Sequence, residues 1–107
     1  MDARQSPRVP LDSLAFLESD RDDGHGAVVN LSRTGAQLSS AYPAHPGDYL
    51  SQSLSLPDQV SSLDVMLAAV RWVQGRHFGV EFIQIPAYEQ SRLRDFLGNP
   101  PADKTAP

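Results

Sequence analysis

The chain has 107 residues, which is enough for one domain with one modest hydrophobic core. Its formal net charge of -4 argues against a protein that binds nucleic-acid polymers or anionic membranes, because such binding depends on many basic contacts. The sequence contains no cysteine, which excludes disulfide frameworks, thiolate metal sites and cysteine nucleophiles.

The N-terminal segment, MDARQSPRVP, carries two arginines before any apolar run begins. It lacks the hydrophobic core of a secretory signal, and no later stretch approaches membrane-spanning length, so we expect a cytoplasmic protein. Pro7 restricts the backbone between Arg4 and Arg8, and each guanidinium offers parallel N–H donors that match a phosphate or the O6 and N7 atoms of guanine. Because residues 1–8 contain few apolar groups, we predict a flexible arm, which is either a solvated tail or a clamp for a compact anion.

The first part of the chain predicts three strands, at 9–19, 27–32 and 36–41. The polar run DRDDGHG (20–26) is typical of a hairpin turn in which Gly24 or Gly26 supplies a positive φ. The triplet RTG (33–35) forms the second turn.

A short motif, Asn30-x-Ser32-x-x-Gly35, follows the second predicted strand into this turn. Strand alternation directs Val29 and Leu31 to one face, and it directs Val28 and the two polar residues to the other. A side-chain carbonyl and a hydroxyl on one face can bond polar groups of a ligand. Gly35 permits a positive φ and a close approach of that ligand to the backbone. The same pattern is also ordinary turn chemistry, expected by chance in roughly one chain in ten of this composition.

The remainder of the chain predicts a loop, three further strands, a helix and a tail. These cover residues 42–48, 49–57, 62–85 (two strands joined near 74–76), 86–98 and 99–107. Leucine alternates with serine in the first of these strands, which indicates one buried face. Pro86 suits the first turn of the helix and Gly98 its end, whereas the proline-rich tail is expected to be disordered.

Six short strands followed by one helix predict a β-dominated fold, an antiparallel barrel or sandwich with a helix packed against it. The three histidines, His25, His45 and His77, lie in different segments without metal-ligand spacing. The sequence offers no nucleophile–base constellation, so neither a metal site nor an enzyme is expected.

Three segments together resemble the PilZ domain, a bacterial receptor module for cyclic di-GMP. They are RQSPR at the N-terminus, NLSRTG in the hairpin between two early strands, and VRWVQGRHFGVEF near the end. The resemblance covers about residues 4–98, and it implies a six-stranded antiparallel PilZ-type β-barrel with a C-terminal α-helix over residues 9–98.

The resemblance also assigns a ligand site. Its residues are Arg4, Arg8, Asn30, Ser32 and Gly35, with Trp72 as a further candidate. In the family, the arginines grip phosphates and guanine bases, and the Asn–Ser–Gly motif forms the opposing wall. Trp72 either stacks on a guanine or belongs to the core, and Arg33 and Arg71 add positive charge on a side that the sequence leaves open.

The implied function is that of a cyclic di-GMP receptor, with no cofactor, that relays the signal to an unidentified protein effector by ordering its N-terminal arm. Several members carry a third basic residue where Ala3 stands here, so one ligand per site is favoured over a stacked pair. We expect a monomer that binds neither a nucleic-acid polymer nor a membrane. An adaptor of the same fold that acts without the nucleotide is the alternative, and the retained motifs favour the receptor.

Overall fold

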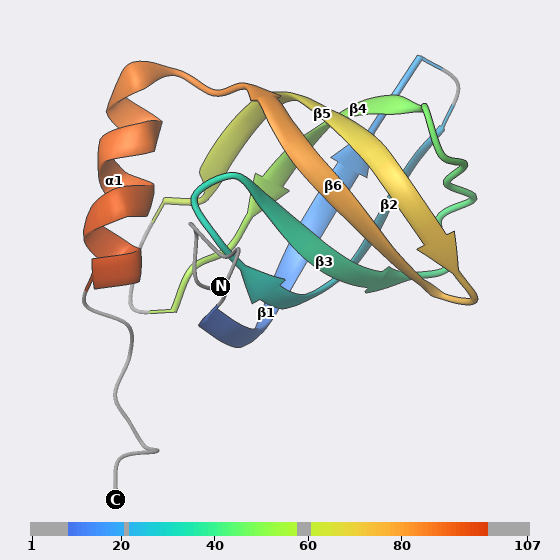
Figure 1. Cartoon of the computed structure of the whole chain (residues 1–107), viewed down its shortest axis with the longest axis horizontal. Helices are drawn as coiled ribbons and strands as arrows, with labels where there is room; N and C mark the ends of the chain where they lie inside the picture. The colour runs from blue at the N-terminus through green and yellow to red at the C-terminus, as the bar shows by residue number, and fades with distance from the viewer. Residues whose placement is uncertain (1–8, 21, 58–60, 99–107) are drawn as a thin grey trace, which may run out of the picture.

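The structure, a computed structural model, describes residues 9–20, 22–57 and 61–98. Within these residues the chain forms six antiparallel strands and one helix (Figure 1): β1 (Val9–Glu18), β2 (Asp23–Leu31), β3 (Gly35–Ser40), β4 (Tyr49–Leu54), β5 (Leu63–Gln74), β6 (His77–Gln84) and α1 (Ala87–Gly98). The strand order β1-β2-β3-β6-β5-β4 closes into a barrel because β4 also pairs with β1. The predicted barrel with a C-terminal helix is confirmed, while the predicted arm and tail, 1–8 and 99–107, lie outside the described residues.

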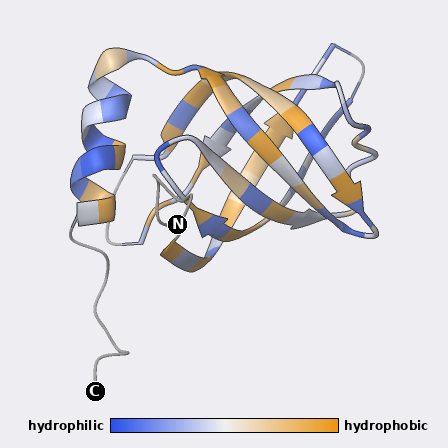
Figure 2. Ribbon diagram, in the orientation of Figure 1, coloured by the Kyte–Doolittle hydropathy of each residue, from blue (hydrophilic) through white to orange (hydrophobic). Residues whose placement is uncertain are grey.

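Strand alternation builds the core, and apolar and polar residues alternate along the strands in Figure 2. In β4, Leu50 and Leu54 are buried inside the barrel while the intervening serines lie on the outer side. The helix lies beside one end of the barrel, where Leu93 and Phe96 join the same core (Figure 1). The outer surface of the strands is therefore the part of the barrel that is available for binding.

Two charged side chains of α1 connect the helix to the barrel through hydrogen bonds with backbone groups of residues 61, 62 and 64. Glu89 is 2% exposed, and its carboxylate accepts a hydrogen bond from the backbone N–H of Asp64 at 3.0 Å. Arg92 pairs with the same carboxylate at 2.7 Å and also donates to the carbonyl oxygens of Ser61 and Ser62. Because the buried Glu89 carboxylate has both an ionic partner and a backbone partner, the cost of burying its charge is offset.

The turn between β1 and β2 differs from the prediction. The backbone N–H of Ser19 donates to the carbonyl of Asp22 at 2.8 Å, so the chain reverses before Gly24 and Gly26, which both lie within β2. Neither glycine has a positive φ. A β-carbon on Gly26 would overlap the carbonyl oxygen of Ser39, so close strand approach explains this glycine.

The alternation predicted for β2 is also wrong. Val28 and Leu31 are both buried although they are three residues apart. The pairing of β2 with β3 shifts register between Val28 and Asn30, which leaves Val29 as the extra residue of a bulge. The bulge reverses the facing of the residues that follow it, and it determines how the chain enters the turn after Leu31.

The hairpin predicted near residues 74–76 is confirmed. β5 ends at Gln74 and β6 begins at His77, and Gly75 has a φ of 62°. This tight connection holds the long strands β5 and β6 side by side, which positions the surface described next.

Candidate ligand-binding site

The two hairpins that carry the sequence motifs meet at a hollow on the outer face of β3, β6 and β5. Its volume is about 440 Å³, within the range of small-molecule sites. The lining residues come from the β2–β3 turn, β3, β5 and β6: Thr34, Gly35, Ala36, Gln37, Arg71, Trp72, Gly79, Val80 and Glu81. Of the predicted site residues, the hollow therefore brings together Gly35 and Trp72, which are far apart in the sequence.

Ser32 shapes the turn beside the hollow. The side chain is 1% exposed, and its hydroxyl oxygen accepts hydrogen bonds from the backbone N–H groups of Thr34 and Gly35, both at 3.2 Å. The backbone N–H of Ser32 donates to the carbonyl of Gly35 at 2.9 Å. The observed role of Ser32 is thus to cap a turn, and a direct contact with a ligand stays a prediction.

Gly35 is required by strand packing rather than by a positive φ. Its φ is not in the left-handed region, so the predicted backbone conformation is wrong. A β-carbon at this position would overlap the carbonyl oxygen of Val80 on β6. The close contact continues with the backbone N–H of Phe82, which donates to the carbonyl of Thr34 at 2.8 Å. The glycine therefore lets the motif-bearing turn lie directly against β6.

Asn30 lies on β2, beside the lining residue Gln37 of β3. Its side-chain amide donates to Oε1 of Gln37 at 3.0 Å, and Gln37 in turn lines the hollow. Asn30 is half-buried and is not itself among the lining residues. In this arrangement it orients Gln37, and direct contact of Asn30 with a ligand stays a prediction.

Trp72 lies on the outer surface and not in the core. The side chain is 39% exposed, and its pyrrole ring covers Gly79 on the neighbouring strand. A β-carbon on Gly79 would lie 2.6 Å from Cε2 and 2.9 Å from Cδ1 of the indole. The missing side chain thus provides a seat for the ring, which remains open to the hollow and can stack on a planar ligand.

Arg71 supplies the positive charge among the lining residues. Its guanidinium pairs with Glu81 on the adjacent strand, with Nε and Nη2 at 2.8 Å and 2.7 Å from the same oxygen, Oε1. Both side chains are about half exposed, so the pair can exchange partners when a ligand arrives.

Arg4 and Arg8 lie outside the residues that the structure describes. The register of the barrel places Val9, the first residue of β1. Val9, which follows Arg8 in the sequence, pairs with Leu31, which directly precedes Ser32. The first described residue of β1 thus lies beside the strand end that leads into the Ser32–Gly35 turn.

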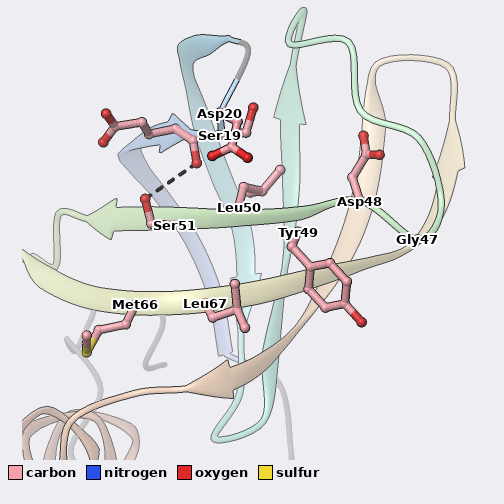
Figure 3. A pocket seen from close by; sticks show the side chains of 10 residues that line it. Ser19, Asp20, Gly47, Asp48, Tyr49, Leu50, Ser51, Met66 and Leu67 are labelled. Atoms are coloured by element: carbon pink, nitrogen blue, oxygen red, sulfur yellow. Dashed lines mark hydrogen bonds between the residues drawn. The ribbon is translucent and has the colours of Figure 1, made fainter.

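A larger hollow of about 680 Å³ lies elsewhere, over β4 and β5 (Figure 3). Glu18, Asp20 and Asp48 line it, together with the exposed side chains of Tyr49 and Met66. No arginine or lysine is among the described residues around it. Three carboxylates would repel a dianionic ligand, so the smaller hollow is the better candidate for an anion despite its size.

Within the described ranges, no group of three His, Asp or Glu side chains could hold a metal ion. No helix among the described residues is long and apolar enough to cross a membrane.

Sequence reasoning missed six residues that line the hollow: Thr34, Ala36, Gln37, Gly79, Val80 and Glu81. Gly79 and Glu81 follow the correctly predicted 74–76 hairpin, and their alternation on β6 was a usable signal. The register between β3 and β6, which brings Gln37 to the same place, has no local signal in the sequence.

Comparisons with known proteins agree with this architecture. A family model described as the PilZ domain matches residues 2–99. The solved structure of Bacillus subtilis inhibitor of motility (MotI/DgrA) superposes with a TM-score of 0.75 at 18% sequence identity, covering 91% of this chain and 50% of that chain. The chain thus spans about half the length of that protein, and at this identity the likeness shows the fold. Among curated protein sequences, none matches the chain.

Proposed function

The chain belongs to the PilZ domain family, and on this premise we propose that it is a bacterial cyclic di-GMP receptor that relays the signal to a protein partner. The family consists of receptor and adaptor modules, so we assign it binding and not catalysis. The proposed receptor is a cytoplasmic monomer that needs no cofactor.

One observation carries the proposal, namely the pairing of Val9 with Leu31. Val9 follows the Arg4-x-x-x-Arg8 segment in the sequence, Leu31 precedes the Ser32–Gly35 turn, and this turn borders the hollow that contains Trp72. This order supports a site that the two motifs share. Two arginine forks match the phosphates and guanine edges of a cyclic dinucleotide of guanine, and an indole can stack on its bases.

The proposed division of roles follows from these positions. Arg4 and Arg8 clamp the phosphates and one guanine, and Trp72 stacks on a base. Gly35, which has no side chain, allows the ligand to approach the backbone of the turn. Asn30 orients Gln37 through a hydrogen bond, and Ser32 stabilises the turn by accepting hydrogen bonds from its N–H groups.

The proposed relay uses the N-terminal arm. Ordering the arm over a bound dianion changes the surface that continues into β1, and a partner that recognises the ordered form binds preferentially to the liganded receptor. The similar Bacillus subtilis protein is named an inhibitor of motility, and a name of that kind is consistent with action through another protein.

Calorimetric titration of the chain with cyclic di-GMP tests the proposal. We expect a dissociation constant in the micromolar range or tighter, about -8 kcal/mol or more favourable. Arg8→Ala is expected to weaken binding by roughly 2–4 kcal/mol, because a charge-assisted contact is lost. Absence of binding by the parent chain would contradict the receptor proposal and favour an adaptor that acts without the nucleotide.

A further inference from the structure

A carboxylate lies in the hollow that we assign to a dianion. Glu81 lines it together with Trp72 and Gly79, and the Glu81 side chain is about half exposed. A negative charge at this place weakens phosphate binding unless a positive charge neutralises it. It is retained at no cost to affinity if the carboxylate also makes a favourable contact with another part of the ligand. The hydrogen bonds of Glu81 allow both, because they pair its charge with Arg71 and leave one carboxylate oxygen for a ligand.

Arg71 neutralises the charge of Glu81 but bonds to only one of its two carboxylate oxygens. Both of its contacts, from Nε and Nη2, reach Oε1 of Glu81. Within the described part of the chain, Oε2 accepts no hydrogen bond. One carboxylate oxygen is therefore available as an acceptor, next to a guanidinium that fixes the orientation of the other.

The distance along β6 from Gly79 to Glu81 is comparable to the size of a purine base. Gly79, on which the indole of Trp72 lies, and Glu81 are two residues apart on the same outer face. Their α-carbons are thus roughly 7 Å apart along the strand. A base that stacks on the indole has one edge at about the distance of the carboxylate.

From this geometry, and resting on the proposed function, we propose that Glu81 is a specificity-determining residue that reads the Watson–Crick edge of a guanine stacked on Trp72. Guanine presents two adjacent donors there, N1–H and the N2 amine, and both can donate to Oε2, the carboxylate oxygen that Arg71 leaves available. Adenine presents an acceptor at N1, which a carboxylate repels. The contact would add to the arginine forks, which read the opposite edge through O6 and N7.

Four ligands distinguish this role of Glu81 from other possible roles of its carboxylate. They are cyclic di-GMP, cyclic di-IMP, cyclic di-AMP and the 2′-deoxy analogue of cyclic di-GMP. Cyclic di-IMP keeps N1–H but lacks the N2 amine, so comparing it with cyclic di-GMP isolates one of the two proposed bonds. The 2′-deoxy analogue removes the ribose hydroxyls, the other donors that a carboxylate can engage.

Each ligand is titrated against the parent chain, Glu81→Gln and the matched control Glu18→Gln. Glu18 lines the other, acidic hollow, so its substitution removes the same charge away from the proposed site. Thermal melts establish that each variant is folded.

We expect the parent to bind cyclic di-GMP at least about tenfold more tightly than cyclic di-IMP, since a hydrogen bond to a charged group is lost. In Glu81→Gln this ratio is expected to fall to about threefold or less, and the preference over cyclic di-AMP to fall as well, whereas Glu18→Gln keeps the parental ratios.

Two patterns would overturn the inference while leaving the proposed function intact. If Glu81→Gln tightens or weakens all four ligands by the same factor, the carboxylate acts only through charge or structure. If instead the substitution abolishes the difference between cyclic di-GMP and its 2′-deoxy analogue alone, Glu81 reads the sugar. Failure of the parent chain to bind cyclic di-GMP at all would overturn the proposed function and this inference together.

Discussion

Gly79→Ala tests whether the absence of a side chain at residue 79 positions the indole of Trp72. The added β-carbon would lie 2.6 Å and 2.9 Å from two indole atoms, well inside ordinary contact distance, so the ring has to move off β6. Base–aromatic stacking contributes about 1–3 kcal/mol, so the loss of a positioned indole should weaken cyclic di-GMP binding by a factor of roughly 5 to 150. Because the ring lies at the surface, the free energy of unfolding should change by about 1 kcal/mol or less.

Fluorescence provides a direct assay of this change, because Trp72 is the only tryptophan in the sequence. Gly79→Ala should shift the emission of the unliganded protein to longer wavelength and weaken binding in a titration. Gly98→Ala is the matched control, since a β-carbon there meets nothing within 4 Å. Unchanged emission together with parental affinity in Gly79→Ala would refute the proposed role of Gly79 and of the ring above it.

Three further changes test other parts of the structure. Gln52→Leu should raise the free energy of unfolding by about 1–3 kcal/mol, because both amide atoms of this buried side chain lack a partner among the described residues. Urea denaturation measures this change, and a loss of stability would mean that water satisfies the amide. Gly35→Val should lower the melting temperature as well as the affinity, because its side chain would overlap Val80 and separate β3 from β6; a stable variant that only loses binding would contradict this packing role. Arg4→Ala should weaken cyclic di-GMP binding less than Arg8→Ala, because Arg8 directly precedes the first residue of β1; equal losses by calorimetry would count against unequal anchoring.

Much of the fold was predictable because its signals are local. The leucine–serine alternation of 49–57 correctly indicated a strand with one buried face, and the Gln74–Arg76 segment correctly indicated a hairpin. The helix was equally readable, since Pro86 and Gly98 mark its two ends.

The features that sequence reasoning missed depend on contacts between distant residues. Gly35 is a glycine because of Val80, and the seat of Trp72 is Gly79 on another strand. The bulge at Val29 reverses the facing of the motif without any residue type that signals it. Motif composition thus suggested a candidate site, while only the register of the barrel shows which motif residues line the hollow and which lie beside it.

The most direct test of the account is to map cyclic di-GMP binding by amide and indole chemical shifts in NMR spectra of the ¹⁵N-labelled chain. We predict that the largest changes cluster at Thr34, Gly35, Gly79 and the indole N–H of Trp72, and that Met66 in the acidic hollow remains unperturbed. Perturbations centred on the acidic hollow, or none at saturating ligand, would contradict the assignment of the binding site to the outer face of β3, β6 and β5.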